Sequence, residues 1–222
     1  MRSQKPCVNI HTHQIGLGEN IISVLNRSAG GKAELEATHY SLGIHPWQLQ
    51  HADPEVLKTM MLGDLARGHP IAIGEAGYDR AIRVPLALQH DILVWQEEIA
   101  ASLHLPVIYH AVKADDLLLA RAKAMPGLVR IIHGFAGRSS SAAQLLRAGF
   151  CFSFGEALLN SRRSAAGSIR VVPLDRLFLE TDESSFSIQE IYAQAANLLN
   201  LDVAYLRNAI FANFVRIFNL KE

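Results

Sequence analysis

The sequence predicts a single α/β domain folded as a (β/α)8 barrel of the TIM type. Eight short runs with strand character recur along the chain, and most of them lie between segments with helical periodicity. Strands that alternate with helices form parallel sheets, and eight parallel strands are the number that closes a barrel. The chain has 222 residues, half of them apolar, which is enough for one sizeable core. We therefore expect one domain over residues 1–222.

The predicted strands follow the apolar runs in chain order. They are Cys7–His13, Asn20–Leu25, His39–His45, Pro70–Ala76, Pro106–His110, Val129–Gly134, Gly149–Gly155 and Arg176–Asp182. Only six residues separate His13 from Asn20, too few for the usual crossover helix. The sequence therefore predicts an abbreviated connection between the first two strands.

The predicted helices are recognised by the spacing of their apolar residues. They are Leu86–Leu103, Asp115–Met125, Ser140–Ala148, Ser187–Leu199 and Asp202–Phe218. Ser187 and Asp202 have side chains suited to capping the starts of the last two. These segments supply the helices that a parallel sheet requires between its strands.

Composition limits the class of protein. The 21 basic and 21 acidic residues cancel, so any nucleic-acid contact would have to be local. Cys7 and Cys151 are the only cysteines, and residues 1–6 lack the apolar core of a signal peptide. No uninterrupted apolar segment approaches the roughly 20 residues that span a bilayer. We expect a cytoplasmic protein without a membrane segment, with a monomer as the default state.

Polar residues recur at the downstream ends of the predicted strands, where the active sites of parallel barrels lie. They are His11, His13, His45, Glu75, His110, His133 and Asp182. In a strand alternate side chains share a face, so His11 and His13 point the same way and could bind one ion. Imidazole and carboxylate ligands together suit Zn, Mn, Fe, Co or Ni, and Mg if water fills much of the shell.

Any one of these histidines, taken alone, is more often a core or surface residue than a metal ligand. The set is different, because burying several imidazoles and two carboxylates together is costly unless a cation compensates them. Histidines 51, 69, 90 and 104 follow no such rule and are expected to be surface or capping residues. His39, at the start of its predicted strand, is expected to lie on the far side of the barrel in a structural role.

The motifs in this order resemble those of the TatD family of metal-dependent deoxyribonucleases, which fold as amidohydrolase-like barrels. The matching stretches are His11-Thr12-His13, Gly43-Ile44-His45-Pro46, Ile73-Gly74-Glu75-Ala76-Gly77-Tyr78-Asp79, Val107-Ile108-Tyr109-His110, Ile132-His133-Gly134-Phe135-Ala136-Gly137 and Leu179-Glu180-Thr181-Asp182. The resemblance implies a site for two divalent ions, one held by His11, His13, Glu75 and Asp182, the other by Glu75, His110 and His133. It also implies phosphodiester hydrolysis in DNA, often from a 3′ end.

The residue types agree with such a mechanism. A carboxylate shared by two cations about 4 Å apart fits Glu75, and the ions would activate a bridging water. Asp182, at a strand end, could both ligate and act as general base. For His45 we weigh a place in the substrate pocket above metal ligation. Asp79 either orients a ligand or caps a helix.

Several departures from the family pattern bear on the substrate. Asn9 replaces the usual Asp before the first histidine, and Gln14-Ile15 replaces a common Leu-Asp. The arginine usually found two residues after His110 is absent, although Lys113 could supply a phosphate contact. After Asp182 the long loop rich in Arg and Pro is missing, as in the compact TatD-like subgroup.

Basic side chains that follow strands are candidates for contact with phosphates, or simply solvated loop residues. They are Arg80, Lys113, Arg138, Arg162 and Arg163, with Lys113 and Arg138 as the assigned substrate-binding pair. For Trp47 and Phe135 we weigh packing under a loop above stacking on a base.

These observations predict a metal-dependent hydrolase with two divalent ions (Mg, Mn, Zn, Co, Ni or Fe), acting as a phosphodiesterase on DNA ends. Glu75 and Asp182 are the predicted catalytic residues. A small-molecule amidohydrolase or lactonase with the same binuclear site is the alternative among enzymes. A metal-binding adaptor without catalysis is the alternative from another class.

Overall fold

The computed structural model describes residues 5–15, 18–31, 38–160 and 164–220. Within them, eight parallel strands form one sheet in sequence order: β1 (Cys7–Thr12), β2 (Ile21–Ser28), β3 (His39–Gly43), β4 (Ala72–Asp79), β5 (Val107–Val112), β6 (Arg130–Ile132), β7 (Phe150–Phe154) and β8 (Leu177–Leu179). The Asp182 N–H donates to the His11 carbonyl at 3.0 Å, and the His13 N–H donates to the Asp182 carbonyl at 3.3 Å. These two bonds join the first strand to the segment after the last, as a barrel requires. The predicted (β/α)8 fold is confirmed.

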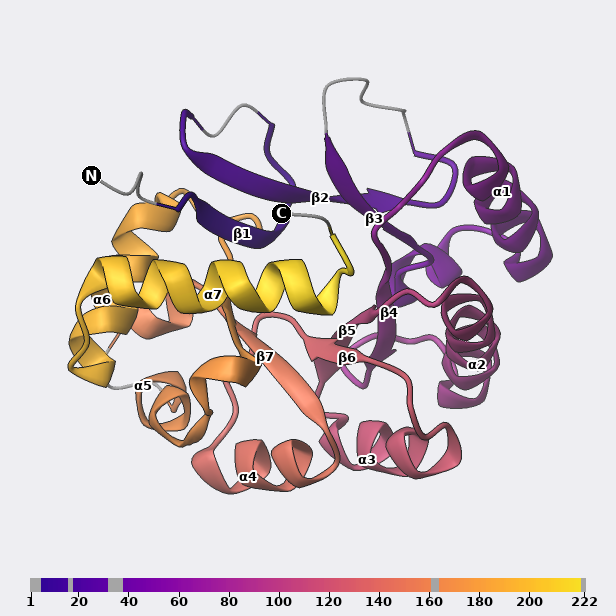
Figure 1. Ribbon diagram of the computed structural model, residues 1–222. Coiled ribbons are helices and arrows are strands. Elements are labelled where there is room, and N and C mark those ends of the chain that lie inside the picture. The colour runs from indigo at the N-terminus through magenta and orange to yellow at the C-terminus, as the bar shows by residue number, and fades with distance from the viewer. Residues whose placement is uncertain (1–4, 16–17, 32–37, 161–163, 221–222) are drawn as a thin grey trace.

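Helices surround the strands (Figure 1). They are α1 (Pro54–Arg67), α2 (Leu86–Leu103), α3 (Asp115–Ala124), α4 (Ser139–Arg147), α5 (Ala165–Ser168), α6 (Ile188–Leu199) and α7 (Val203–Ile217). The described residues also form four short 3-10 helices: η1 (Pro46–Gln50), η2 (Glu156–Leu159), η3 (Ile169–Val171) and η4 (Leu174–Arg176). The five predicted helices correspond to α2, α3, α4, α6 and α7.

Side-chain caps fix the starts of two predicted helices. The Ser187 hydroxyl accepts from the Glu190 N–H at 3.3 Å, and the Asp202 carboxylate accepts from the N–H groups of Ala204 and Tyr205. Each cap satisfies backbone donors that have no partner inside the helix. The predicted N-caps are therefore correct.

Helix α1 was not predicted from the sequence. Its side chains buried in the core are Leu57 and Met61, so the helix has no wide apolar stripe to give a periodic pattern. Asp53 caps it, with its carboxylate accepting from the N–H groups of Glu55 and Val56. Pro54 follows at the first helical position, so local capping rather than periodicity marks this helix.

The first connection is abbreviated, as predicted. Residues 13–15 and 18–20, which are the described part between β1 and β2, contain no helix. Strand β2 runs on to Ser28, three residues past the predicted end at Leu25. This extension carries Asn26 to the same end of the barrel as the histidines of β1.

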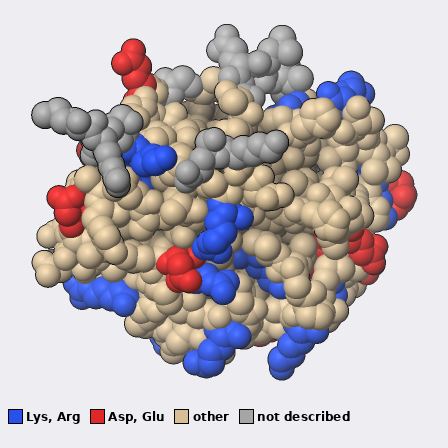
Figure 2. Space-filling view, in the orientation of Figure 1, with Lys and Arg blue, Asp and Glu red and all other residues tan. Residues whose placement is uncertain are grey.

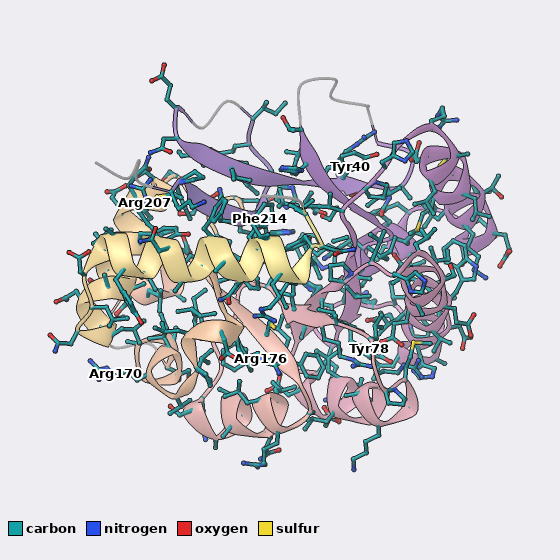
Figure 3. All side chains as sticks on the ribbon, viewed as in Figure 1. Tyr40, Tyr78, Arg170, Arg176, Arg207 and Phe214 are labelled. Atoms are coloured by element: carbon teal, nitrogen blue, oxygen red, sulfur yellow. The ribbon has the colours of Figure 1, made fainter. Side chains whose placement is uncertain are left out.

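Helix α7 lies across the opposite end of the barrel (Figure 1). Its buried Phe214 (Figure 3) packs against His39 at the start of β3, with ring centroids 5.6 Å apart. His39 therefore has the structural role expected of it, and burial lowers the pKa of its imidazole. Figure 2 views this closed side, where lysine and arginine side chains lie among acidic ones.

Candidate metal centre

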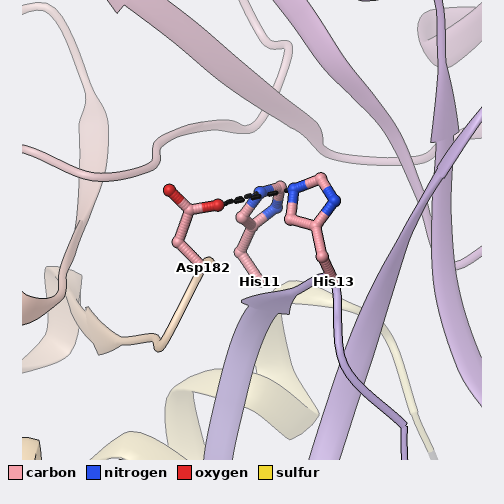
Figure 4. Close-up of side chains that lie close together, drawn as sticks. All are labelled: His11, His13 and Asp182. Carbon is pink, nitrogen blue, oxygen red and sulfur yellow. Dashed lines mark ion pairs between the residues drawn. The ribbon is translucent and has the colours of Figure 1, made fainter. Parts of the chain in front are cut away.

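His11 and His13 lie on the same face at the end of β1, with Asp182 beside them (Figure 4). The Asp182 Oδ1 atom is 3.5 Å from His11 Nε2 and 3.4 Å from His13 Nε2. Alternation along a strand explains why residues two apart converge, and the bonds between β1 and the Asp182 backbone bring the carboxylate to them. Three predicted ligands thus form one group.

Glu75 of β4 lies between this group and the other histidines. Its Oε2 atom is 3.5 Å from His11 Nε2, while its Oε1 atom is 3.0 Å from His110 Nδ1 and 2.7 Å from His133 Nε2. His45 Nε2 lies 3.4 Å from the same Oε1. The structure therefore brings together all six predicted metal ligands and His45, with the Glu75 carboxylate at their centre.

The pKa values of the clustered side chains indicate that the site lacks positive charge. Burial would raise the pKa of Glu75, but the imidazoles of His133, His11 and His110 hold it well below its usual range. Burial and the neighbouring His133 oppose protonation of His11, yet the carboxylates of Asp182 and Glu75 raise its pKa to about 9. Glu75 and Glu180 likewise raise the pKa of His133 against the effect of burial. Protons on the imidazoles thus supply charge that bound cations would otherwise supply.

The donor atoms fit a divalent cation. His11 is fully buried, and neither ring nitrogen has a hydrogen-bond partner that satisfies it. Four sets of three donors each lie within 4.8 Å of one another: His11 with His13 and Asp182, His11 with Glu75 and His133, His45 with Glu75 and His110, and His133 with Glu180 and Asp182. Unsatisfied buried imidazoles among carboxylates are what a metal ion would pair.

His45 differs from the other histidines in its hydrogen bonds. Its Nδ1 atom accepts from the Trp47 N–H at 3.1 Å, so the N–H of the neutral ring is at Nε2. That Nε2–H points at Glu75 Oε1, and burial lowers the pKa of the ring, which favours the neutral form. In this tautomer Nε2 carries a proton and has no free lone pair, so His45 could complete its set of donors only by giving up the hydrogen bond from Trp47.

Asp79 of β4 holds His110 in place. Its Oδ2 atom accepts from Trp47 Nε1 at 2.7 Å and lies 3.3 Å from His110 Nε2. Its Oδ1 atom accepts from the Ala81 N–H at 2.7 Å. Of the two interpretations of Asp79, the structure supports the orienting one, because Pro85 and not Asp79 precedes α2 as its N-cap residue.

Two residues of the site were missed by the sequence analysis. Asn26 donates to Glu75 Oε2 at 2.9 Å, and Glu180 Oε1 accepts from the Gly134 N–H at 2.6 Å and lies 3.3 Å from His133 Nδ1. Asn26 carried no signal, because the strand was expected to end before it. Glu180 could have been found, since residues 180 and 182 share one face of the strand predicted over Arg176–Asp182.

The assigned phosphate-binding residues lie in the segments that follow β5 and β6. Lys113 follows β5 and Arg138 immediately precedes α4, and both side chains are exposed. Arg80 is engaged elsewhere, because its guanidinium binds the Asp116 carboxylate through two hydrogen bonds of 2.6 and 2.8 Å. It is therefore a poor candidate for phosphate contact. Arg162 and Arg163 lie outside the described residues.

A cavity of about 360 Å³ opens beside the cluster, between the segments that follow β6, β7 and β8. Its lining includes Gly134, Gly155, Glu156, Glu180, Asp182 and Glu183. The Asp182 side chain is 42% exposed, so it is the carboxylate of the cluster that a substrate or a water molecule in this cavity can reach.

No helix in the described part of the chain is both long and apolar enough to cross a membrane.

Among solved structures, the chain is similar to the TatD homologue YJJV of Escherichia coli K12, with a TM-score of 0.79 and 23% identity over 90% of this chain and 86% of that one. A TatD family hydrolase of Entamoeba histolytica gives a TM-score of 0.77 at 14% identity, and the match covers 96% of this chain and 98% of that one. At these identities the likeness shows the fold.

The chain also matches curated relatives at sequence identities of 26–30%. Human Deoxyribonuclease TATDN3 is 30% identical over 155 residues, which are 64% of this chain and 56% of the human protein. The Danio rerio relative tatdn3 is 28% identical over 175 residues, 74% of this chain and 65% of the relative. The chain thus spans less than two thirds of these relatives. The metal-dependent hydrolase YcfH of Escherichia coli is 26% identical over 198 residues, which are 82% of this chain and 74% of that protein.

The model of the family described as TatD related DNase matches residues 26–219, which is most of the chain. It covers Glu75, His110, His133 and Asp182 in one continuous match. The family predicted from the motifs is confirmed, and the chain belongs to the family of TatD related DNases.

Proposed function

We propose that this protein hydrolyses phosphodiester bonds at DNA ends with the help of two divalent cations. The observation that carries the proposal is the position of the Glu75 carboxylate, one oxygen facing His11 and the other facing His110 and His133. A carboxylate placed in this way suits a bridge between two ions. The named deoxyribonucleases among the relatives favour DNA as the substrate.

In this proposal one cation would be held by His11, His13, Glu75 and Asp182, and the other by Glu75, His110 and His133. Bound there, such ions supply a water of lowered pKa and neutralise charge on the phosphodiester. Glu75 is buried and keeps its charge, because the imidazoles hold its pKa well below the usual range. It can therefore serve as a fixed anionic ligand throughout the reaction.

Asp182 has a second role, as the general base. Its Oδ1 atom is positioned by two histidines, and its partial exposure lets water from the adjoining cavity approach the carboxylate. His45, with its N–H at Nε2, would donate a hydrogen bond to a phosphate oxygen. Lys113 and Arg138 would contact phosphates farther along the strand.

The alternative of a small-molecule amidohydrolase or lactonase is less well supported. It would use the same residues, but the family match and the curated relatives point to nucleases and related hydrolases. An uncharacterized amidohydrolase of Saccharomyces cerevisiae shares the fold, with a TM-score of 0.75 at 12% identity. At that identity the likeness shows the fold alone.

The test is purified protein stripped of metal and reloaded separately with Mg, Mn, Co or Zn. Substrates are single- and double-stranded DNA labelled at the 3′ or the 5′ end, and bis-p-nitrophenyl phosphate. Metal-dependent cleavage of DNA that disappears in Asp182→Asn is the expected result and gives the polarity. If the protein binds metal but leaves every phosphodiester intact, the proposal is wrong, and amides, lactones and phosphomonoesters should be screened.

A further inference from the structure

Trp47 presents an exposed aromatic surface at the edge of the metal centre. It lies in η1, which begins three residues after the end of β3, and 54% of its surface is exposed. Its ring lies edge-on to His45, with centroids 5.1 Å apart, and its centroid is 6.3 Å from that of His110. The expectation that Trp47 packs under a loop is therefore wrong, because more than half of the residue is open to solvent.

A hydrogen bond to a buried carboxylate fixes the orientation of the Trp47 ring. Nε1–H donates to Asp79 Oδ2 at 2.7 Å, and Asp79 is 2% exposed. Asp79 is itself held, since its backbone N–H donates to Gln89 Oε1 at 2.7 Å. At the other end, the Trp47 backbone N–H donates to His45 Nδ1. A ring held in this way can receive a flat ligand with little further loss of conformational freedom.

The charged side chains near the centre offer little for holding a phosphate backbone. Arg80 is paired with Asp116, and the cavity beside Asp182 is lined by Glu156 and Glu183. Lys113 and Arg138 are left for phosphates farther along the strand, so affinity at the DNA end itself needs contacts other than charge. Nucleobases stack on aromatic side chains regardless of sequence, typically for about 1–3 kcal/mol per base.

We propose that Trp47 is the platform on which a nucleobase next to the scissile phosphodiester stacks. The proposal rests on the proposed phosphodiesterase function and adds how the substrate is recognised. Stacking on Trp47 places the flanking phosphate beside His45 and His110, the two rings that Trp47 contacts. A DNA end that lacks the base at this position is then a poor substrate, whatever the sequence of the remaining bases.

The first test compares cleavage of oligodeoxynucleotides that differ by one base. One has thymine at both terminal positions, and two others carry an abasic tetrahydrofuran residue at the last or the penultimate position. For the wild type, KM should rise by about 10-fold for one of the abasic ends. Trp47→Leu should raise KM for the thymine substrate by a similar factor and remove the difference. Trp47→Phe should retain most of the discrimination.

The two variants separate stacking from a purely structural role. Both lose the Nε1 hydrogen bond to Asp79, so equal losses in Trp47→Leu and Trp47→Phe would show that Trp47 acts only by positioning Asp79, and would overturn the proposal. Equal cleavage of thymine and abasic ends by the wild type would overturn it as well, while leaving the nuclease function intact. If no phosphodiester is cleaved, the proposed function is wrong. The role of Trp47 is then tested by measuring oligonucleotide binding directly.

Binding is measured by fluorescence. The chain has two tryptophans, so Trp95→Phe leaves Trp47 as the emitting residue. In the Trp95→Phe, Asp182→Asn protein with excess Mg in solution, a thymidine trinucleotide should quench the emission more strongly than its abasic counterparts. Equal quenching by all of them, or none, would contradict stacking on Trp47.

Discussion

Asn26 and Glu75 are joined by two hydrogen bonds. The Asn26 amide nitrogen donates to Glu75 Oε2 at 2.9 Å, and the Glu75 backbone N–H donates to Asn26 Oδ1 at 3.2 Å. Ser41 also donates to Asn26 Oδ1, at 3.4 Å. One amide thus fixes both the backbone and the carboxylate of the residue that we propose to bridge two cations.

Replacing Asn26 should therefore weaken metal binding. In Asn26→Ala the Glu75 carboxylate loses its donor, and partners of this kind typically contribute 10- to 100-fold to metal affinity. Isothermal titration of the metal-free protein with Mn or Zn measures the change. Asn197→Ala, at an exposed position of α6, is the matched control and should bind as the wild type does. Unchanged affinity in Asn26→Ala would mean that Glu75 does not depend on Asn26.

The metal-free protein should lose stability as the pH rises. The pKa of His11 is about 9 in the folded chain against about 6.5 for an ordinary imidazole, because Asp182 and Glu75 outweigh the effects of burial and His133. The folded state therefore holds a proton that the unfolded chain releases. The stabilisation is complete below pH 6.5 and is lost as the pH rises through 9.

Urea unfolding of the metal-free protein measures this effect. The free energy of unfolding should fall by up to about 3 kcal/mol between pH 6.5 and well above pH 9. His11→Gln removes the titrating ring and should flatten the dependence. A free energy of unfolding that rises over this interval would contradict the protonated state inferred for His11.

The exposed cations after β5 and β6 should affect DNA binding but not the chemical step. Lys113→Ala with Arg138→Ala should raise KM for DNA several-fold and reduce its dependence on salt, while leaving turnover of bis-p-nitrophenyl phosphate unchanged. Lys123→Ala with Arg147→Ala, exposed near the carboxyl ends of α3 and α4, removes the same charge far from those loops. If both pairs behave alike, Lys113 and Arg138 are not substrate-binding residues.

Much of the site follows from one rule of parallel barrels, that polar residues at the downstream strand ends converge. The rule brought His11, Glu75 and His133 together correctly although they lie far apart in the chain. The rule works because a buried strand end normally carries an apolar side chain, so a polar side chain at such a position indicates a functional site.

The sequence could not show relationships that depend on distant partners. The pairing of Arg80 with Asp116 removes a candidate phosphate ligand and joins residues 36 positions apart. The position of Asn26 depends on how far β2 extends beside β3, which apolar periodicity does not define. Trp47 donates a hydrogen bond to Asp79, which lies 32 positions away in the chain. The single domain, the monomeric state and the cytoplasmic location stay predictions.

The most direct test of the account is the number of metal ions that Glu75 holds. Metal-free wild type and Glu75→Gln are equilibrated with excess Mn or Zn, freed of unbound ions by gel filtration and analysed by elemental mass spectrometry. We expect two ions per wild-type chain, and one or fewer per Glu75→Gln chain with loss of DNA cleavage. One ion in a fully active wild type, or two ions in an active Glu75→Gln, would contradict a binuclear site bridged by Glu75.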